Sequence, residues 1–263
     1  ARRGEVREPH LGLICANFTP PTEERPALLT HREVETLFHE FGHMLHHLLS
    51  TVEVPALAGT NVPRDWVELP SHFMENWTWH EDALALFAGH FESGKPIPAE
   101  LLAKLQESRT FMEARAQMRQ LSFGTIDLAL HVDYDPAAGD DPVEFANRVR
   151  ERFVHRPEHA HDAFLCAFAH IFSSGYAAGY YSYKWSEMLE ADAFTRFEEN
   201  GIFDRATGQR FAETILARGD SLDQRQQFRD FMGREPQLDA LLRRNLGESA
   251  AVTAGVQPPA GGN

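Results

Sequence analysis

The residues most able to do chemistry form a His-Glu-x-x-His sequence, His39-Glu40-Phe41-Gly42-His43. Two histidines four positions apart on a helix lie one turn from each other, so both imidazoles can bind one metal ion, Zn²⁺ being typical. Glu40 projects to the side of them, where it can act as a base toward a water molecule. This chemistry requires a helix, so the flanking sequence must supply one.

The flanking sequence predicts such a helix. Residues 30–33, Thr-His-Arg-Glu, have the pattern of a capping box, and the helix is expected to run to about Leu49. At about 100° per residue, His39 and His43 lie roughly 140–180° from an apolar stripe. We therefore expect the stripe to face the core and the histidines to lie opposite, with solvated surface histidines as the alternative. The stripe consists of Val34, Leu37, Phe38, Phe41, Leu45 and Leu48.

Three neighbours of the motif add expectations. Gly42 in mid-helix costs roughly 1 kcal/mol relative to alanine, which indicates that something approaches the backbone closely. Glu35 lies one turn before His39 and is a candidate to accept its second N–H, or else an ordinary solvated glutamate. His46 and His47 extend the polar face and are expected at the surface or behind the metal ligands.

A catalytic zinc site commonly adds one carboxylate ligand and keeps its fourth position for water. The segment after a loop rich in Pro, Gly and Asn offers Glu68, His72 and Glu75. Asp65 and Glu68 also fit the first and fourth positions of a plain capping box. The pattern alone does not choose among the three candidates.

A tyrosine-rich run is the second unusual feature, because four of the five tyrosines fall within residues 176–183. Small residues alternating with tyrosines suit a flexible loop that passes close to a ligand. A tyrosine hydroxyl is a suitable donor to the oxyanion that forms in peptide hydrolysis. For Tyr180 and Tyr181 we prefer packing at the edge of the core.

Residues 38–46 and 65–71 together resemble the thimet oligopeptidase family of zinc metallopeptidases, also called peptidase family M3. The family holds its zinc with the two histidines and with a glutamate twenty-five residues beyond the second one. The resemblance therefore implies one Zn²⁺ per chain, bound by His39, His43 and Glu68.

The same resemblance implies roles for further residues. Glu35 and Asp65 would orient the two ligand histidines, and His72 stands where the family usually has glutamine. Tyr176 and Tyr183 would contact the substrate and the oxyanion, and His170 would contact the substrate.

The resemblance extends from about Leu13 to Leu246, and residues 191–198 and 233–242 narrow it to one bacterial branch of the family. It implies a mainly α, zincin-like (neurolysin-like) catalytic region over residues 1–246 with a small β element. Residues 11–18 are the best strand candidate. Residues 247–263 are expected to form a disordered tail.

Composition restricts the class of protein. The formal net charge of −14 in 263 residues argues against a nucleic-acid partner and is compatible with cationic peptides. Two cysteines provide no disulfide framework and favour a reducing compartment, here the cytoplasm. Polar residues interrupt the most apolar run, near 163–183, so we expect no membrane span. A monomer is expected.

These observations predict a zinc-dependent endopeptidase that hydrolyses internal bonds of short peptides, with Glu40 as the base. A dipeptidyl carboxypeptidase of the same family is one alternative. A zinc-stabilised, non-catalytic fragment that needs a missing partner segment is another, and His72 would then be the nearest fourth ligand. Because family members have several hundred residues before this region, we expect the chain to pack against a missing N-terminal part.

Overall fold

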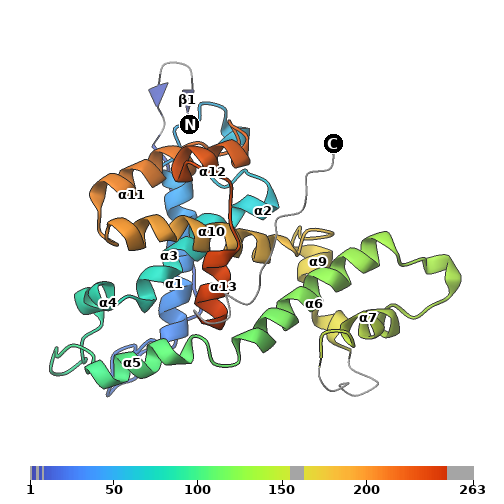
Figure 1. Ribbon diagram of the computed structural model, residues 1–263, viewed down its shortest axis with the longest axis horizontal. Coiled ribbons are helices and arrows are strands. Elements are labelled where there is room, and N and C mark those ends of the chain that lie inside the picture. Colours follow the sequence, from blue (N-terminus) through green and yellow to red (C-terminus); the bar gives the residue numbers. More distant parts are fainter. Residues whose placement is uncertain (1, 4–5, 8, 155–162, 248–263) are drawn as a thin grey trace.

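The computed structural model describes residues 2–3, 6–7, 9–154 and 163–247, and these are almost entirely helical (Figure 1). The predicted mainly α fold class is therefore confirmed. None of the described helices is long and apolar enough to cross a membrane. The helices are α1 (His31–Leu48), α2 (Arg64–Val67), α3 (Leu69–Glu75), α4 (Glu81–Phe87), α5 (Ala99–Ser108), α6 (Glu113–Val132), α7 (Pro142–Arg150), α8 (Phe164–Ala167), α9 (His170–Ser173), α10 (Ser182–Asn200), α11 (Arg205–Phe211), α12 (Gln224–Met232) and α13 (Asp239–Leu246). Short 3₁₀ turns are η1 (Pro55–Leu57), η2 (Asn76–Trp79) and η3 (Pro136–Ala138), and η4 (Ala212–Leu216) is a π-helical turn.

The main body is built around α1, α3 and α10, which pack on one another in that order (Figure 1). Its core is aromatic, and the rings of Phe73 and Phe211 stack with centroids 4.0 Å apart. Burying rings of this size supplies much of the apolar area that stabilises a helical domain. Because Phe73 lies on α3, this core fixes the helix that must present a carboxylate to α1.

Helices α6 and α7 form an arm that projects from the body (Figure 1), and α8 packs against α7. A second hydrophobic core lies inside the arm and includes Phe123, Ile126, Phe168 and Ile171. Tyr180 belongs to this core as well, which confirms the packing role expected for it. The tyrosine-rich run is therefore packed against the arm through Tyr180.

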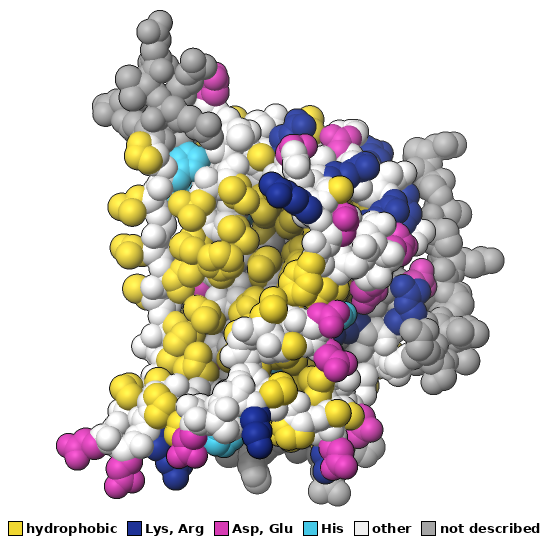
Figure 2. All heavy atoms as spheres, turned by 90° about the vertical axis from the view of Figure 1, so that its left-hand side faces the viewer, with side chains coloured by type: hydrophobic (Ala, Val, Ile, Leu, Met, Phe, Trp, Pro, Cys, Tyr) yellow, Lys and Arg dark blue, Asp and Glu magenta, His cyan; other side chains and the backbone are white. Residues whose placement is uncertain are grey.

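Helix α1 begins and ends as predicted, but its apolar stripe is only partly covered. The capping box of Thr30 and Glu33 is present, and the helix ends one residue before Leu49. Leu37 and Phe41 are 37% and 38% exposed, whereas the other four members of the stripe are half-buried and Leu45 packs against the main core. The face that carries the histidines is covered as well, because it packs against α3. Hydrophobic side chains also gather over much of one side of the molecule (Figure 2).

His46 lies on that packed face, so its predicted surface position is wrong. The side chain is completely buried, and neither ring nitrogen has a hydrogen-bonding partner among the described residues. Burial lowers the pKa of His46 to about 4, so the ring is neutral at physiological pH. His46 therefore behaves as a core residue of the α1–α3 contact.

The β element is not where the sequence predicted it. The described strands are β1 (Arg2–Arg3) and β2 (Val6–Arg7), which pair antiparallel. Residues 11–18 are extended but form no ladder with any described strand, and instead follow α1 in the opposite direction. His47 Nε2 lies 3.1 Å from the Leu11 carbonyl, and the Thr19 amide donates to Glu33 at 2.7 Å. Side chains of α1, rather than a neighbouring strand, contact the backbone at the two ends of this segment.

Gly42 marks the point where α1 and α3 cross. A Cβ at this position would lie 2.3 Å from the Pro70 carbonyl oxygen and 2.6 Å from the Ser71 Cα. Both contacts are with backbone, which cannot rotate away as a side chain could. The close approach predicted from the glycine is confirmed, and it brings the start of α3 against the histidines.

We expect Gly42→Ala to lower the free energy of unfolding by about 3 kcal/mol or more, because the methyl group forces the helices apart. Gly208→Ala is the matched control, since Gly208 also lies in a helix but a Cβ there meets nothing within 4 Å. The control should gain about 0.5–1 kcal/mol from helix propensity. Urea unfolding of both variants measures the difference. Equal effects would show that the α1–α3 crossing tolerates a side chain.

Candidate metal centre

Glu68 lies at a break between two short helices. Helix α2 ends at Val67 and α3 begins at Leu69, with Pro70 in the first turn of α3. Proline has no N–H to continue the hydrogen-bond ladder of α2, so the chain starts a new helix in a new direction. The break turns the Glu68 side chain toward α1, and the carboxylate is buried there. The plain capping box considered for Asp65 and Glu68 is not formed.

His39, His43 and Glu68 converge on one point. The Glu68 Oε2 atom lies 3.3 Å from His39 Nε2 and 3.1 Å from His43 Nε2. One nitrogen or oxygen from each of the three residues lies within 4.8 Å of the others, as ligands of a single ion require. Two imidazoles and one carboxylate form the donor set typical of a catalytic zinc ion, so the residues present fit this metal.

The electrostatics of the three residues also favour a cation. Burial alone would lower the pKa of His39, but hydrogen bonds with Glu68 and Glu75 raise it to about 10. Burial would likewise raise the pKa of Glu68, but hydrogen bonds from the two histidines keep it well below its usual range. The centre thus holds positive charge against an ionised carboxylate. A divalent cation would take the place of the protons that the imidazoles otherwise carry.

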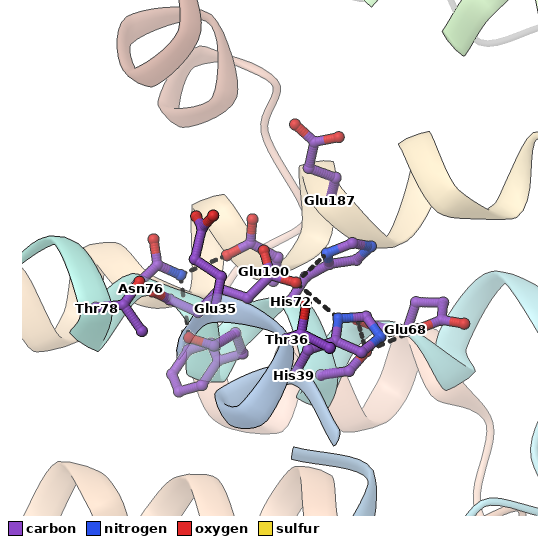
Figure 3. Close-up of polar contacts among 12 residues, drawn as sticks. Glu35, Thr36, His39, Glu68, His72, Asn76, Thr78, Glu187 and Glu190 are labelled. Atoms are coloured by element: carbon purple, nitrogen blue, oxygen red, sulfur yellow. Dashed lines mark hydrogen bonds and ion pairs between the residues drawn. The ribbon is translucent and has the colours of Figure 1, made fainter. Parts of the chain in front are cut away.

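The group has three protein ligands rather than four. Within the described chain, no further His, Cys, Asp or Glu atom joins His39, His43 and Glu68 in their cluster. His72 lies beside His39, with ring centroids 5.1 Å apart (Figure 3), but it does not belong to the cluster of His39, His43 and Glu68. The arrangement therefore leaves the fourth position of a tetrahedral ion without a protein ligand, as a catalytic zinc site requires and a purely structural site does not.

Glu40 remains available for chemistry. It lies one turn before His43 on α1 and is half-buried. Among the described residues it has no hydrogen bond or ion pair. A carboxylate that is not committed to a structural partner can accept a proton from a water molecule.

Glu75, and not Glu35, accepts the second N–H of His39. The Nδ1 atom of His39 lies 2.6 Å from Glu75 Oε1, whereas Glu35 accepts from the Trp79 indole at 2.7 Å. The role expected for Glu35 is therefore wrong. Glu75 belongs to α3, the helix that carries the Phe73 core, so packing brings it closer than a neighbour on the same helix. A carboxylate at Nδ1 fixes the tautomer and leaves Nε2 for the metal.

Asp65 does not orient His43 either. Its carboxylate accepts a hydrogen bond from Tyr181 at 3.4 Å, and its backbone carbonyl accepts from Ser186 at 3.0 Å. Both partners belong to the tyrosine-rich run and the start of α10. The contacts of Asp65 therefore link α2 to these segments and not to the second histidine.

The structure brings Tyr176 to the metal centre, stacks Tyr183 on Tyr176 and places His170 at the edge of these two rings. The Tyr176 hydroxyl donates to Glu68 Oε1 at 2.8 Å, and its ring stacks on Tyr183 with centroids 4.9 Å apart. The exposed His170 ring lies 6.3 Å and 6.4 Å from these two rings. Burial raises the pKa of both tyrosines, so their hydroxyls stay protonated and can donate hydrogen bonds.

Asp127 is a supporting residue that the sequence analysis missed. It is fully buried on α6 and accepts the backbone N–H groups of Ala178 and Tyr180 at 2.9 Å and 2.8 Å. This carboxylate holds the tyrosine-rich run on the arm, so the expected flexible loop is anchored at this point. An aspartate in mid-helix, on a face with apolar neighbours, was the only sequence signal that could have indicated a buried acceptor.

Comparison with known sequences agrees with this geometry. The sequence model of Peptidase family M3 matches residues 2–246. The chain belongs to peptidase family M3. The resemblance inferred from the motifs is confirmed, including its narrowing to one bacterial branch, which is that of oligopeptidase A.

Three relatives show how similar this chain is to other proteins and how much of their length it covers. Oligopeptidase A of Salmonella typhimurium is 48% identical over 240 residues, which cover 91% of this chain and 35% of that protein. Probable cytosolic oligopeptidase A of Arabidopsis thaliana is 47% identical over 251 residues, covering 93% and 36%. Dipeptidyl carboxypeptidase of Escherichia coli is 38% identical over 232 residues, covering 88% and 34%. The chain thus spans about a third of the length of these relatives.

The assignment of Glu75 as the partner of His39 is testable. We expect Glu75→Gln to weaken Zn²⁺ binding roughly tenfold to a hundredfold, because the imidazole loses the charge that orients it. Glu35→Gln is the matched control and should leave the Zn²⁺ affinity unchanged. Competition with a chromophoric chelator measures both dissociation constants. A loss of affinity in the Glu35 variant alone would contradict the assignment.

Proposed function

We propose that this chain carries the catalytic centre of a zinc-dependent oligopeptidase that hydrolyses internal bonds of short peptides. The observation that carries the proposal is the convergence of His39, His43 and Glu68 around an open position, with Glu40 free beside them. Membership of family M3 supports the reaction class, and the identity to oligopeptidase A supports the preference for oligopeptides.

His39, His43 and Glu68 would hold the zinc ion, with Glu75 behind His39. When bound there, zinc supplies a Lewis acid that polarises the scissile carbonyl and lowers the pKa of water. Glu40 takes one proton from the attacking water while the water oxygen bonds to the carbonyl carbon. Glu40 then returns that proton to the amine nitrogen as the C–N bond breaks, so that protons and charges balance.

The tyrosines would stabilise the negative charge that develops on the carbonyl oxygen. Tyr183 is proposed as the main hydrogen-bond donor to this oxyanion, assisted by Tyr176, whose hydroxyl now donates to Glu68. Both hydroxyls are protonated, which a donor must be. His170 is proposed to contact the peptide, because it is exposed at the edge of the same aromatic group.

The dipeptidyl carboxypeptidase alternative shares all these residues and differs in how the peptide C-terminus is recognised. The lower identity to dipeptidyl carboxypeptidase, 38% against 48%, favours the endopeptidase. Peptides with a blocked C-terminal amide separate the two, since only an endopeptidase cleaves them well. The non-catalytic alternative is disfavoured because His72 does not belong to the cluster of His39, His43 and Glu68 and so does not close the metal centre.

We also propose that further protein covers the exposed apolar side. The relatives are about three times as long as this chain, and the stripe of α1 leaves Leu37 and Phe41 at the surface. Apolar surface of this kind is normally buried against a partner. We propose a monomer that packs against such a segment in the cytoplasm, with peptides as its only other partners.

The role of Glu40 provides the test of the mechanism. We expect Glu40→Gln to keep one bound Zn²⁺ but to lower kcat roughly 10²- to 10⁴-fold, because the amide cannot accept the proton. Glu81→Gln, at an exposed position on α4, is the control for the change of charge. Zinc content is measured by elemental analysis and turnover with a quenched peptide. Full activity in the Glu40 variant would refute the proposed base.

A further inference from the structure

A cavity of about 340 Å³ lies outside the metal centre, where η2, the end of α5, α10 and α13 meet. None of the proposed metal ligands, the base or the tyrosines lines it. Its wall carries three guanidinium groups, those of Arg109, Arg243 and Arg244, but only one carboxylate, that of Glu198. The cavity is therefore locally cationic in a chain whose formal net charge is −14.

The three arginines differ in how their charges are balanced. Arg244 is paired with Glu190 and also lies 3.4 Å from a Glu187 oxygen. Arg109 has no carboxylate within 4 Å in the described part of the chain. It donates one hydrogen bond to the Asn76 amide oxygen at 3.2 Å and lies over the Trp79 ring at 5.1 Å.

Arg109 is half-buried, so water neutralises its charge only in part. Burial and the repulsion of Arg244 lower its pKa to about 10, against the weaker attraction of Glu190, Glu35 and Glu198. A guanidinium in this position lacks a counter-charge that its fork of N–H groups could bind. Arg243 is exposed on the same wall and also has no ion pair among the described residues.

A second cavity of about 400 Å³ adjoins this one and shares Asn76, Trp79, Arg109 and Arg244 with it. Its wall is acidic, since it carries Glu35, Glu75, Glu113, Glu187 and Glu190. These carboxylates outnumber the cations on the same wall and so disfavour an anion there. Negative charge is thus favoured only in the cavity that Arg109 shares with Arg243.

We propose that the cavity lined by Arg109, Arg243 and Arg244 binds a small free oxyanion of the phosphate type. Arg109 would be the principal ligand, because its N–H groups have no carboxylate to satisfy them. Guanidinium groups bind phosphate and carboxylate oxygens through paired, charge-assisted hydrogen bonds. The bound anion would also separate the charges of Arg109 and Arg244.

Isothermal titration with inorganic phosphate tests the proposal at constant ionic strength, with chloride as the balancing ion. We expect saturable binding of one phosphate per chain. Arg109→Gln should weaken it roughly tenfold to a hundredfold, the loss expected for hydrogen bonds to a charged group. Arg115→Gln is the matched control, because Arg115 is an exposed cation on α6 that does not line the cavity. The control should bind phosphate like the unaltered chain.

A parallel titration with an acetylated, amidated aspartate distinguishes a free oxyanion from a carboxylate on a peptide. Phosphate binding that depends on Arg109 supports the proposal. Binding of the aspartate without phosphate binding would overturn it in favour of a peptide carboxylate. No saturable phosphate binding, or equal binding in the Arg109→Gln and Arg115→Gln variants, would also overturn it. Circular dichroism of each variant shows that a lost signal is not a lost fold.

Discussion

The close crossing of α1 and α3 at Gly42 is the contact on which the rest of the structure depends. Backbone atoms of Pro70 and Ser71 occupy the space that any Cβ at Gly42 would need. Only at this separation does the carboxylate of Glu68 come within 3.3 Å of both ligand nitrogens. The cost of a glycine in mid-helix is thus offset by the approach of the third ligand.

The second constraint is charge. Burial would neutralise the imidazole of His39 and the carboxylates of Glu68 and Glu75, but hydrogen bonds among these groups hold all three in their charged forms. A hydrogen bond with Glu75 also raises the pKa of His72 against the effect of burial. Such a group is stable only if every member stays in place, because one removed partner leaves a buried charge unpaired. The aromatic core around Phe73 keeps α3 in place and so keeps both carboxylates against α1.

Features that depend on residues close together in the sequence could be predicted, whereas features that depend on the packing of distant segments could not. The helix of residues 31–48, its cap and its paired histidines follow from contacts within a few positions, and these predictions hold. The partner of His39 could not be predicted in this way. Glu35 is close in sequence, but Glu75 reaches the ring because α3 crosses α1. The core-facing orientation predicted for the stripe of α1 holds only in part for a related reason, since periodicity identifies an apolar face without saying what covers it. Asp127 acts through backbone atoms fifty residues away, which no spacing rule reveals.

The most direct test of the central claim is hydrolysis of an internally quenched peptide of about ten residues, before and after chelation. The account predicts cleavage that a chelator abolishes and that one equivalent of Zn²⁺ restores. Cleavage that survives complete removal of metal would contradict the zinc mechanism. Absence of cleavage in a chain that holds one zinc ion would contradict the claim that these residues carry a complete catalytic centre.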